Sequence, residues 1–497
     1  MPGQYYKKSA QSSKAGRGCL LPKTGHLAHQ AWQNCENSTL VWRMARELLY
    51  LCVPFKHDKM KKLNRRDFVK QSSLAAGGAL LGPALLSAQA YASGSDVIRV
   101  GLVGCGGRGT GAAVQALLSG QHVRLTAMAD AFRDNLDRSY QQIKAELEDH
   151  ELPADRLAVP EERKFSGFDG YEQVLPHCDV VLLAAPPGFR PQHFAAAVKA
   201  GKHVFMEKPV AVDAPGVREV LAAAAAAQQK KLNVVVGLQR RYETQYLRWV
   251  ELLQGGAIGD IVTAHVYWNS GGVWVRQRQP GQTEMEYQMR NWYYFNWLCG
   301  DHINEQHIHN LDVGNWVKQA YPVKAHGMGG RQVRTGQDHG EIYDHHFVEY
   351  EYADGSRMFS QCRHIEGTHY RVTESFQGTN GSAPAPGIIL TRSGYRLLDH
   401  DARRDPNPYQ VEQDVLFAAV AKGEHRYADA ENAAKSTLTA LMGRMATYSG
   451  QVVEWEAALH SELSLMPERL AWDAPPPVLP DAAGRYPIAI PGVTKVL

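Results

Sequence analysis

Short apolar runs alternate with helical patterns in the first half of the chain. Between residues 96 and 238, the runs are rich in valine, leucine and alanine, and segments of helical periodicity separate them. This alternation predicts a parallel α/β sheet, and the alanine-rich segment 214–230 is its clearest helix. The predicted strands are residues 98–103, 123–129, 179–185, 203–206 and 233–237.

The pattern changes after Gly237, where apolar and polar residues alternate within single strands. This is typical of an open, mostly antiparallel sheet with one covered face. We predict strands at 261–268, 345–352 and 357–363, a turn at 382–387, and helices at 413–423 and 428–449. The domains would be residues 96–238 and 239–455, followed by a tail, 456–497, without a clear pattern from about Trp472.

A glycine-rich turn, Gly104-x-Gly106-x-x-Gly109, follows the first predicted strand directly. Gly104 permits the tight turn, Gly106 lets the backbone approach a pyrophosphate, and Gly109 lets the next helix pack closely. The pyrophosphate would lie at the helix N-terminus, which favours anions. A glycine-rich turn without a nucleotide is the alternative. This strand–turn–helix context favours a dinucleotide-binding Rossmann domain.

Asp130 ends the second predicted strand, about 20 residues beyond the last glycine, where a ribose-binding acid is expected. Its carboxylate would accept hydrogen bonds from the ribose 2′-hydroxyl and repel a 2′-phosphate. NAD is therefore favoured over NADP, although the nearby Arg133 weakens that preference. The cofactor-binding residues expected here are Gly104, Gly106, Gly107, Arg108, Gly109, Asp130 and Arg133.

Composition narrows the class of protein. The 497 residues suffice for two or three domains with their own cores. The net charge of +3, with no run of lysine or arginine, gives no reason to expect a nucleic-acid partner. The cysteines have neither C-x-x-C nor zinc spacing, and we expect Cys105 and Cys178 to be buried thiols.

The segment Asn64-Arg65-Arg66-Asp67-Phe68-Val69-Lys70 resembles a twin-arginine export signal. A weakly apolar run, 73–86, and small-residue cleavage options at 88–92 follow it. We expect residues 60–92 to be the signal peptide, Met60 to be the start, and residues 1–59 to be a non-native or unstructured extension. The apolar run is too short to span a bilayer, so no stable membrane span is expected after cleavage.

Export would constrain the cofactor. The twin-arginine route carries folded proteins to the periplasm, which offers no free nicotinamide pool. A periplasmic nucleotide-binding protein should therefore fold around its cofactor and keep it.

Lys208 is the first candidate for chemistry. The predicted strand 203–206 leads into Glu207-Lys208-Pro209, and ligands of parallel sheets bind beyond the carboxyl ends of the strands. An ammonium group there can stabilise an oxyanion on a substrate. A cationic oxidised nicotinamide would lower its pKa. The alternative is an ordinary turn at Lys-Pro, fixed by Pro209.

A second polar cluster comes about a hundred residues later. In one helix, His302, Glu305, His309 and Asp312 would form a single stripe. Apolar and aromatic sequence surrounds them, which favours a site lining over a solvated face. His307 would point elsewhere and is expected to be structural. Binding of zinc or manganese by this stripe is the alternative, and our prediction contains no metal.

These motifs together resemble the glucose–fructose oxidoreductase/inositol dehydrogenase/MocA (Gfo/Idh/MocA) family, over roughly residues 97–449. The resemblance rests on the glycine turn, on Ala200-Gly-Lys-His-Val-Phe-Met-Glu-Lys-Pro209, and on a G-x-x-x-x-D/E-x-x-x-H-x-x-D element. It implies a Rossmann domain and a C-terminal α/β domain whose open sheet often forms oligomer contacts. It also implies a small carbohydrate substrate, because members oxidise or reduce a carbinol of a sugar or polyol.

The resemblance also implies roles for single residues. His309 would be the general base, Lys208 would stabilise the alkoxide, and Glu305 would position substrate or imidazole. His193 would lie near the nicotinamide, and Pro186, Glu207 and Lys208 join the cofactor set. The expected substrate-binding residues are Lys208, Glu305, His309, Asp312, His302 and Trp292.

Departures from the family pattern put the substrate in doubt. The usual aspartate is Glu305, the usual Gly-Gly is Cys299-Gly300-Asp301, and His307 replaces a small residue. Several aromatic residues flank the cluster, of which one or two would stack on a sugar. Three arginines, Arg276, Arg278 and Arg290, could bind an acidic group or brace a loop.

The prediction is an exported NAD-dependent oxidoreductase acting on a sugar, polyol or glycoside. Tightly held NAD would make the net reaction redox-neutral, either between two sugars or by oxidation, elimination and reduction of a glycoside. The competing interpretations are a non-catalytic sugar- or nucleotide-binding protein and a metal-dependent lyase or isomerase.

Overall fold

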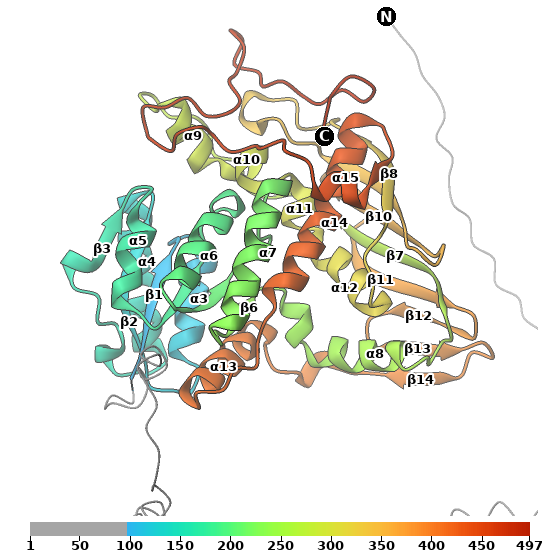
Figure 1. The fold of residues 1–497 in the computed structure, drawn as a ribbon, viewed down its shortest axis with the longest axis horizontal. Coiled ribbons are helices and arrows are strands. Elements are labelled where there is room, and N and C mark those ends of the chain that lie inside the picture. Colours follow the sequence, from blue (N-terminus) through green and yellow to red (C-terminus); the bar gives the residue numbers. More distant parts are fainter. Residues whose placement is uncertain (1–96) are drawn as a thin grey trace, which may run out of the picture. The chain divides into compact units, whose positions relative to one another are not determined.

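The computed structural model describes residues 97–497. The expected signal peptide, 60–92, and the extension, 1–59, lie outside the described residues. Two sheets and the helices around them make up the described part (Figure 1). Within that part, no helix has the length and apolar character needed to cross a membrane.

The first sheet is parallel throughout, as the sequence predicts, with strand order β3-β2-β1-β4-β5-β6. Two predicted strands, 98–103 and 203–206, coincide with β1 and β5. The short β3 was not predicted, because its sequence Lys-Phe-Ser carries no apolar run. The strands are β1 Ile98–Val103, β2 Val123–Asp130, β3 Lys164–Ser166, β4 Val180–Leu183, β5 His203–Met206 and β6 Val234–Val236.

Helices cover both faces of this sheet. Their bounds are α3 Gly107–Leu117, α4 Arg133–Asp149, α5 Gly170–Val174, α6 Arg190–Lys199, α7 Ala214–Gln229 and α13 Pro408–Ala421. On one face, Leu416 and Phe417 of α13 join the apolar cluster of Val100 and Leu102 from β1. A helix from late in the chain thus packs beside α3 and completes the Rossmann core.

The second sheet has nine strands in the order β14-β13-β12-β11-β7-β10-β9-β8-β15. It is antiparallel except for the parallel pair β7 and β10. The strands are β7 Ile261–Ser270, β8 Lys324–Gly330, β9 His345–Glu351, β10 Arg357–His364, β11 Arg371–Gly378, β12 Gly381–Ala385, β13 Ile388–Thr391, β14 Arg396–Asp399 and β15 Val453–Glu454.

The turn that we predicted at 382–387 is wrong in part, because β12 occupies residues 381–385. Proline is tolerated there because the register to β13 shifts between Ser382 and Ala385, which relaxes the need for ladder hydrogen bonds.

The remaining helices lie between or around the sheets. They are α8 Thr244–Gln254, α9 Glu284–Arg290, α10 Asn296–Cys299, α11 His302–Glu305, α12 Ile308–Lys318, α14 Ala430–Ser449 and α15 Trp455–Leu459. Single 3-10 turns complete the chain at η1 Ala154–Arg156, η2 Glu161–Arg163, η3 Leu175–His177, η4 Pro187–Phe189, η5 Gln239–Tyr242, η6 Trp292–Tyr294, η7 Gln337–His339 and η8 Ala402–Arg404.

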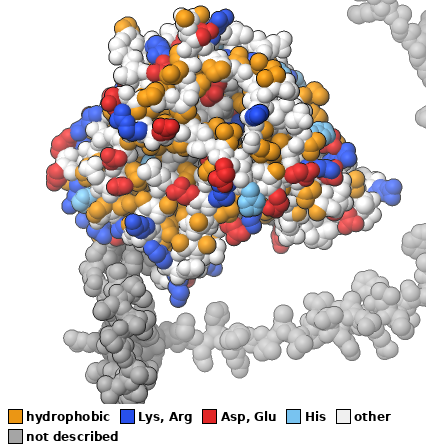
Figure 2. All heavy atoms as spheres, turned by 45° about the horizontal axis from the view of Figure 1, so that its top comes forward, with side chains coloured by type: hydrophobic (Ala, Val, Ile, Leu, Met, Phe, Trp, Pro, Cys, Tyr) orange, Lys and Arg blue, Asp and Glu red, His pale blue; other side chains and the backbone are white. Residues whose placement is uncertain are grey.

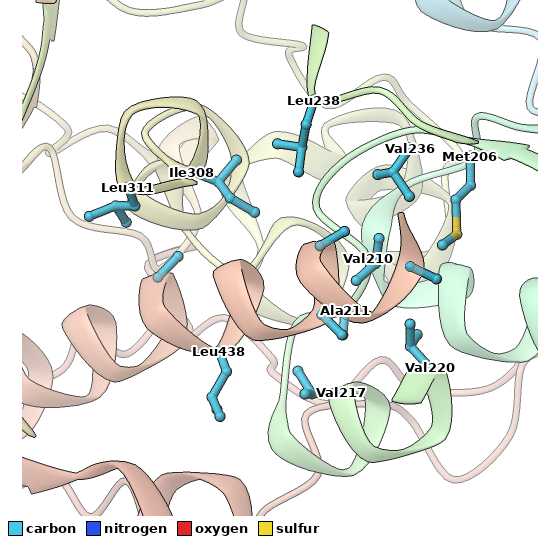
Figure 3. Close-up of a cluster of buried hydrophobic side chains, with 14 of the residues drawn as sticks. Met206, Val210, Ala211, Val217, Val220, Val236, Leu238, Ile308, Leu311 and Leu438 are labelled. Atoms are coloured by element: carbon cyan, nitrogen blue, oxygen red, sulfur yellow. The ribbon is translucent and has the colours of Figure 1, made fainter. Parts of the chain in front are cut away.

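Helix α14 ties the two sheets into one core. Small residues let neighbours approach it closely, and a Cβ on Gly443 would lie 2.1 Å from the hydroxyl of Tyr350. Figure 3 shows Leu438 of α14 near Val217 of α7, in the cluster that also contains Ile308 of α12. This shared core fixes where α11 and α12 stand relative to the Rossmann sheet.

The segment after α15 has no helix or strand but is anchored by side chains. The ring of Trp472 lies 5.0 Å from that of Phe132 and 4.5 Å from that of Phe168. The backbone N–H of Leu465 donates to Asp213 at 2.8 Å. On the face shown in Figure 2, acidic and basic side chains are interspersed.

Candidate active site

A cavity of about 1240 Å³ opens beyond the carboxyl ends of the Rossmann strands. The glycine turn, the end of β2 and the Glu207-Lys208 turn after β5 line one side. Trp268 of β7, the segment 274–292 and the residues Glu305 and His309 line the other. Ligands of parallel α/β sheets bind at the carboxyl ends of the strands. The cavity lies there and is lined from both domains, as expected of a ligand site.

The glycine turn has the shape that a pyrophosphate needs. Gly104 has φ +94°, and a Cβ there would lie 2.3 Å from the backbone nitrogen of Ala185. A Cβ on Gly109 would lie 1.9 Å from the carbonyl oxygen of Gly104. Gly106 and Gly107 instead face open space at the uncapped start of α3. The free N–H groups there fit an anion.

Asp130 is held in place by its neighbours. One carboxylate oxygen accepts from the backbone N–H of Cys105 at 2.7 Å, and the other accepts from that of Phe132 at 2.8 Å. Burial, the largest influence, raises the pKa of Asp130, while these hydrogen bonds oppose the rise. Asp130 lines the cavity, which is where a residue that binds the ribose must lie.

Arg133 does not take part in this arrangement. Its guanidinium bonds Asp137 at 2.9 Å and also bonds Glu161, and its side chain does not line the cavity. Our prediction that Arg133 contacts the cofactor is corrected here. The first turn of α4 directs the side chain outward, where two carboxylates hold it.

Lys208 and Glu305 form a buried pair at the centre of the cavity. The Nζ of Lys208 donates to the Glu305 carbonyl at 2.6 Å and to Oε1 at 3.0 Å. The other carboxylate oxygen, Oε2, has no hydrogen-bond partner. Burial, the largest influence, raises the pKa of Glu305, and the charge of Lys208 opposes that rise. The Lys208–Pro209 peptide bond is cis.

His309 lies beside this pair in the first turn of α12. Its ring stacks on Trp268 with centroids 6.0 Å apart, and its Nδ1 has no partner. Burial, and secondarily the charge of Lys208, hold the pKa of His309 well below its usual range. The imidazole is therefore neutral and able to accept a proton.

His193, which lines the cavity on the side of the Rossmann domain, is also a buried histidine with a lowered pKa. Its Nδ1 is also unpartnered, and its ring stacks on Tyr171 at 4.2 Å. Burial, with a contribution from Arg190, lowers the pKa of His193 to about 3. Pro186, Glu207 and Trp292 line the same cavity, as predicted.

The predicted polar stripe is not one helix. The chain breaks between α11 and α12, and His302 lies outside the cavity, in a buried cluster with Asp301 and His346. The Nδ1 of His302 is 2.8 Å from Asp301, and the Nε2 of His346 is 3.3 Å from the other carboxylate oxygen. The structure therefore does not place His302 where it could bind the substrate.

The residues that could bind a metal are therefore different from those of the predicted stripe. Among residues 97–497, Asp301, His302 and His346 are the group whose ligand atoms all lie within 4.8 Å of one another. Glu305 and His309 face the cavity instead and do not belong to that group.

Asp312 also forms its hydrogen bonds outside the cavity. Its carboxylate accepts two hydrogen bonds of 2.8 Å from Arg241 and one of 2.7 Å from the hydroxyl of Ser436. The side chain is buried and does not line the cavity. The predicted substrate role of Asp312 is therefore corrected to the bracing of α12 against Arg241 and α14. His307, bonded to Ser360 at 2.8 Å, is structural, as expected.

One cavity residue, Tyr409, comes from α13 and was not predicted. Tyr409 lines the cavity below the guanidinium of Arg108, which lies 4.7 Å from its ring centroid. Arg108 also bonds Glu207 at 2.6 Å and Glu412 at 3.4 Å. Burial and then Glu207 raise the pKa of Glu412 well above its usual range. No local pattern could reveal these contacts, because some three hundred residues separate the partners in sequence.

Comparisons with known proteins bear on the first domain and on the fold. Residues 98–238 match the model of an oxidoreductase family with an NAD-binding Rossmann fold, GFO_IDH_MocA. The matched domain, residues 98–238, thus belongs to the Gfo/Idh/MocA family. This family member is an oxidoreductase, and its cofactor is NAD.

The relatives extend beyond the Rossmann domain. Inositol 2-dehydrogenase of Cereibacter sphaeroides is 26% identical over 338 residues, which cover 66% of this chain and 86% of the relative. Scyllo-inositol dehydrogenase from Lactobacillus casei, solved with NAD(H) and scyllo-inositol, has a TM-score of 0.54 at 19% identity, covering 72% and 99%. Aldose-aldose oxidoreductase from Caulobacter crescentus has a TM-score of 0.54 at 17% identity, covering 72% and 99%. The two structures share the fold of both domains.

Proposed function

We propose that the protein is an exported oxidoreductase that uses NAD at a carbinol of a sugar, polyol or glycoside. One observation carries the proposal. The buried groups of Lys208, Glu305 and His309 share one cavity with the glycine turn, and two of them present unpartnered atoms. Unpaired buried polar atoms are costly in a folded protein, so their presence points to a ligand that satisfies them.

The chemistry of these residues fits alcohol oxidation. Bound at the glycine turn and Asp130, NAD would supply the acceptor for a hydride. His309, neutral and desolvated, would take the hydroxyl proton. The ammonium of Lys208 would stabilise the negative charge that develops on the substrate oxygen. Glu305 holds that ammonium in place and offers its free oxygen to a neighbouring hydroxyl.

Export and retention of NAD belong to the proposal as well. The twin-arginine sequence at 64–70 supports export to the periplasm. In the wall of the cavity, Arg290 pairs with Asp134 at 3.1 Å and its guanidinium lies 3.9 Å from the ring centroid of Phe132. This contact joins α9 to the start of α4 beside the ribose-binding acid and would slow the release of NAD. A redox-neutral reaction, on two sugars or on one glycoside, is the consequence that we infer.

We also propose a homo-oligomer. The face of the second sheet that points away from α14 carries a stack of His265 on Phe359, with centroids 5.2 Å apart, and Met328 on it is 72% exposed. Apolar groups on an open sheet face suit burial against a second copy. Light scattering on purified protein would measure the mass, and a monomer would refute this part.

The first experiment is on the protein from about Ser93 onward, purified without added cofactor and then denatured. Mass spectrometry of the supernatant should find NAD(H) in a near one-to-one ratio. An empty protein that binds NAD weakly and exchanges it freely would refute the redox-neutral proposal. Bound NAD without reduction by any sugar would instead favour the non-catalytic binding protein. N-terminal sequencing of the precursor and of the periplasmic form tests export separately.

A further inference from the structure

The three arginines near the cavity have different surroundings. Arg278 bonds Glu284 and the hydroxyl of Tyr486, and Arg290 bonds Asp134 and Glu286. Both therefore brace the segment around α9. Arg276 differs: its backbone N–H donates to Asn291 at 2.8 Å, and its guanidinium makes no ion pair within residues 97–497.

The other cavity cations are engaged. Arg108 pairs with Glu207 at 2.6 Å, Arg138 pairs with Asp134 at 3.2 Å, and Lys208 pairs with Glu305. Arg190 directs two donors to backbone carbonyl oxygens at 2.6 Å. Within the described chain, Arg276 is thus the cavity-lining cation whose side chain has no hydrogen-bond acceptor.

Trp274 gives this guanidinium a fixed support. The charge lies 5.3 Å from the centroid of the Trp274 ring, close enough for a cation–π interaction. Trp274 lines the cavity yet is 41% exposed, and its edge packs against Trp292 at 5.9 Å. An exposed tryptophan on a concave wall offers a flat apolar surface to a ring.

The neighbouring side chains are suited to hydroxyl groups. Gln277, Gln279 and Gln282 line the same wall. The Gln279 amide nitrogen already donates to the Gln277 carbonyl, and the Gln282 amide oxygen accepts from the Gln279 N–H, but the amide oxygen of Gln279 and the amide nitrogen of Gln282 can still bind a hydroxyl. The wall follows directly from β7, which carries Trp268 beside His309. A ligand that places one ring at His309 could thus place a second ring against Trp274.

We propose that Trp274 and Arg276 form a subsite for an anionic sugar ring linked to the ring that is oxidised. The substrate would then be a glycoside bearing a carboxylate or a sulfate. A planar guanidinium binds either group through paired hydrogen bonds, and its stacking on Trp274 orients it in advance. This inference rests on the proposed function, because it assumes a sugar at Lys208 and His309.

The cofactor is a less suitable partner for Arg276. The glycine turn already provides free N–H groups for the pyrophosphate, and Asp130 disfavours a 2′-phosphate. A role in NAD binding nevertheless makes a distinct prediction, which the experiment includes.

The test compares matched disaccharides on the NAD-loaded protein. The neutral probes are cellobiose and lactose, and the anionic probes are their counterparts with a uronate or a 6-sulfate on the second ring. Single-turnover reduction of bound NAD is followed by absorbance for the wild type, Arg276→Gln, Arg276→Lys and Trp274→Phe. Arg403→Gln is the control, because it removes a side chain of the same charge that is also exposed but is paired with Asp401 and lies outside the cavity.

We expect the wild type to reduce its NAD faster with an anionic probe than with its neutral counterpart. Arg276→Gln should lower the second-order rate for the anionic probe about 10- to 100-fold and leave the neutral probe unchanged. Arg276→Lys should keep part of the preference, and Arg403→Gln all of it. The better of uronate and sulfate identifies the anion.

Equal rates for neutral and anionic probes, unchanged in Arg276→Gln, would overturn the subsite and leave the proposed function standing. Loss of NAD from Arg276→Gln, with the rate lowered equally for all sugars, would show that Arg276 binds the cofactor. That result would also overturn the subsite. Absence of turnover with every probe would count against the proposed function. The subsite is then judged by titrating protein fluorescence with the anionic probes: quenching that depends on Trp274 and Arg276 supports it, and no such quenching overturns it.

Discussion

Two clusters of acidic and basic side chains each take two members from residues 301–309 and differ in what they can do. The cavity cluster is Lys208, Glu305 and His309, and the interior cluster is Asp301, His302 and His346. In the interior cluster, both oxygens of Asp301 accept hydrogen bonds, including 2.5 Å from the hydroxyl of Tyr448 and 3.0 Å from the N–H of Tyr343. In the cavity cluster, Glu305 keeps an oxygen free.

The difference teaches that residue type and spacing do not by themselves define a reactive group. A carboxylate saturated with buried donors is a structural anchor, whereas one with a free oxygen beside a cavity can bind a ligand. His302 and Glu305 belong to the same short helix, α11, yet only Glu305 lines the cavity. Replacing members of each cluster should therefore affect activity in one case and folding in the other.

The largest expected effect is on catalysis. Lys208→Met should lower the rate of NAD reduction by about 10³-fold, because it removes the ammonium group that would stabilise the alkoxide. The content of bound NAD should stay close to that of the wild type. Lys318→Met is the matched control, since that lysine pairs with Asp354 outside the cavity. An active Lys208→Met variant would contradict the assignment of the cavity cluster.

Asp301→Asn should mainly reduce stability. The change removes the charge that His302, His346 and Tyr448 surround, and loss of one partner from such a buried network costs about 3–5 kcal/mol. Urea unfolding would measure the free energy of unfolding. A variant as stable as the wild type would show that the interior cluster is not an anchor.

Acid should destabilise the protein through His302. Burial, against the opposing effect of Asp301, lowers the pKa of His302 to about 4 from 6.5. Between pH 6.5 and about 4 the unfolded chain binds a proton at this residue that the folded chain does not, so stability falls as pH falls. His302→Gln should reduce that slope by up to about 1.4 kcal/mol per pH unit, measured by urea unfolding across the window. An unchanged slope would exclude His302 as a source.

The smallest effect is expected at Arg133. Because its partners Asp137 and Glu161 lie on the exposed surface, Arg133→Gln should change stability by no more than about 0.5 kcal/mol. Bound NAD should be unaffected. Asp130→Ala is the comparison and should weaken NAD binding while tolerating NADP. Loss of NAD from Arg133→Gln would restore the role that the structure denies it.

The sequence predicted the features that depend on neighbours in the chain. The glycine turn, the strand before Lys208 and the positions of Glu305 and His309 all follow from local spacing, and these residues lie in the cavity. Contacts between distant segments were not predictable. His346 reaches Asp301 only because β9 packs on α14, and the helical stripe failed because α11 ends at Glu305 and a separate helix, α12, begins at Ile308.

Helix α13 has a consequence for how the protein is made. Leu416 and Phe417 bury one face of the Rossmann sheet, and residue 428 bridges to Val234 at its edge. Synthesis of residues 96–238 therefore leaves the nucleotide domain with an uncovered apolar face. It gains its last helix only after most of the chain has left the ribosome. We therefore expect the nucleotide domain to reach its full stability only once α13 has been made and has packed against it.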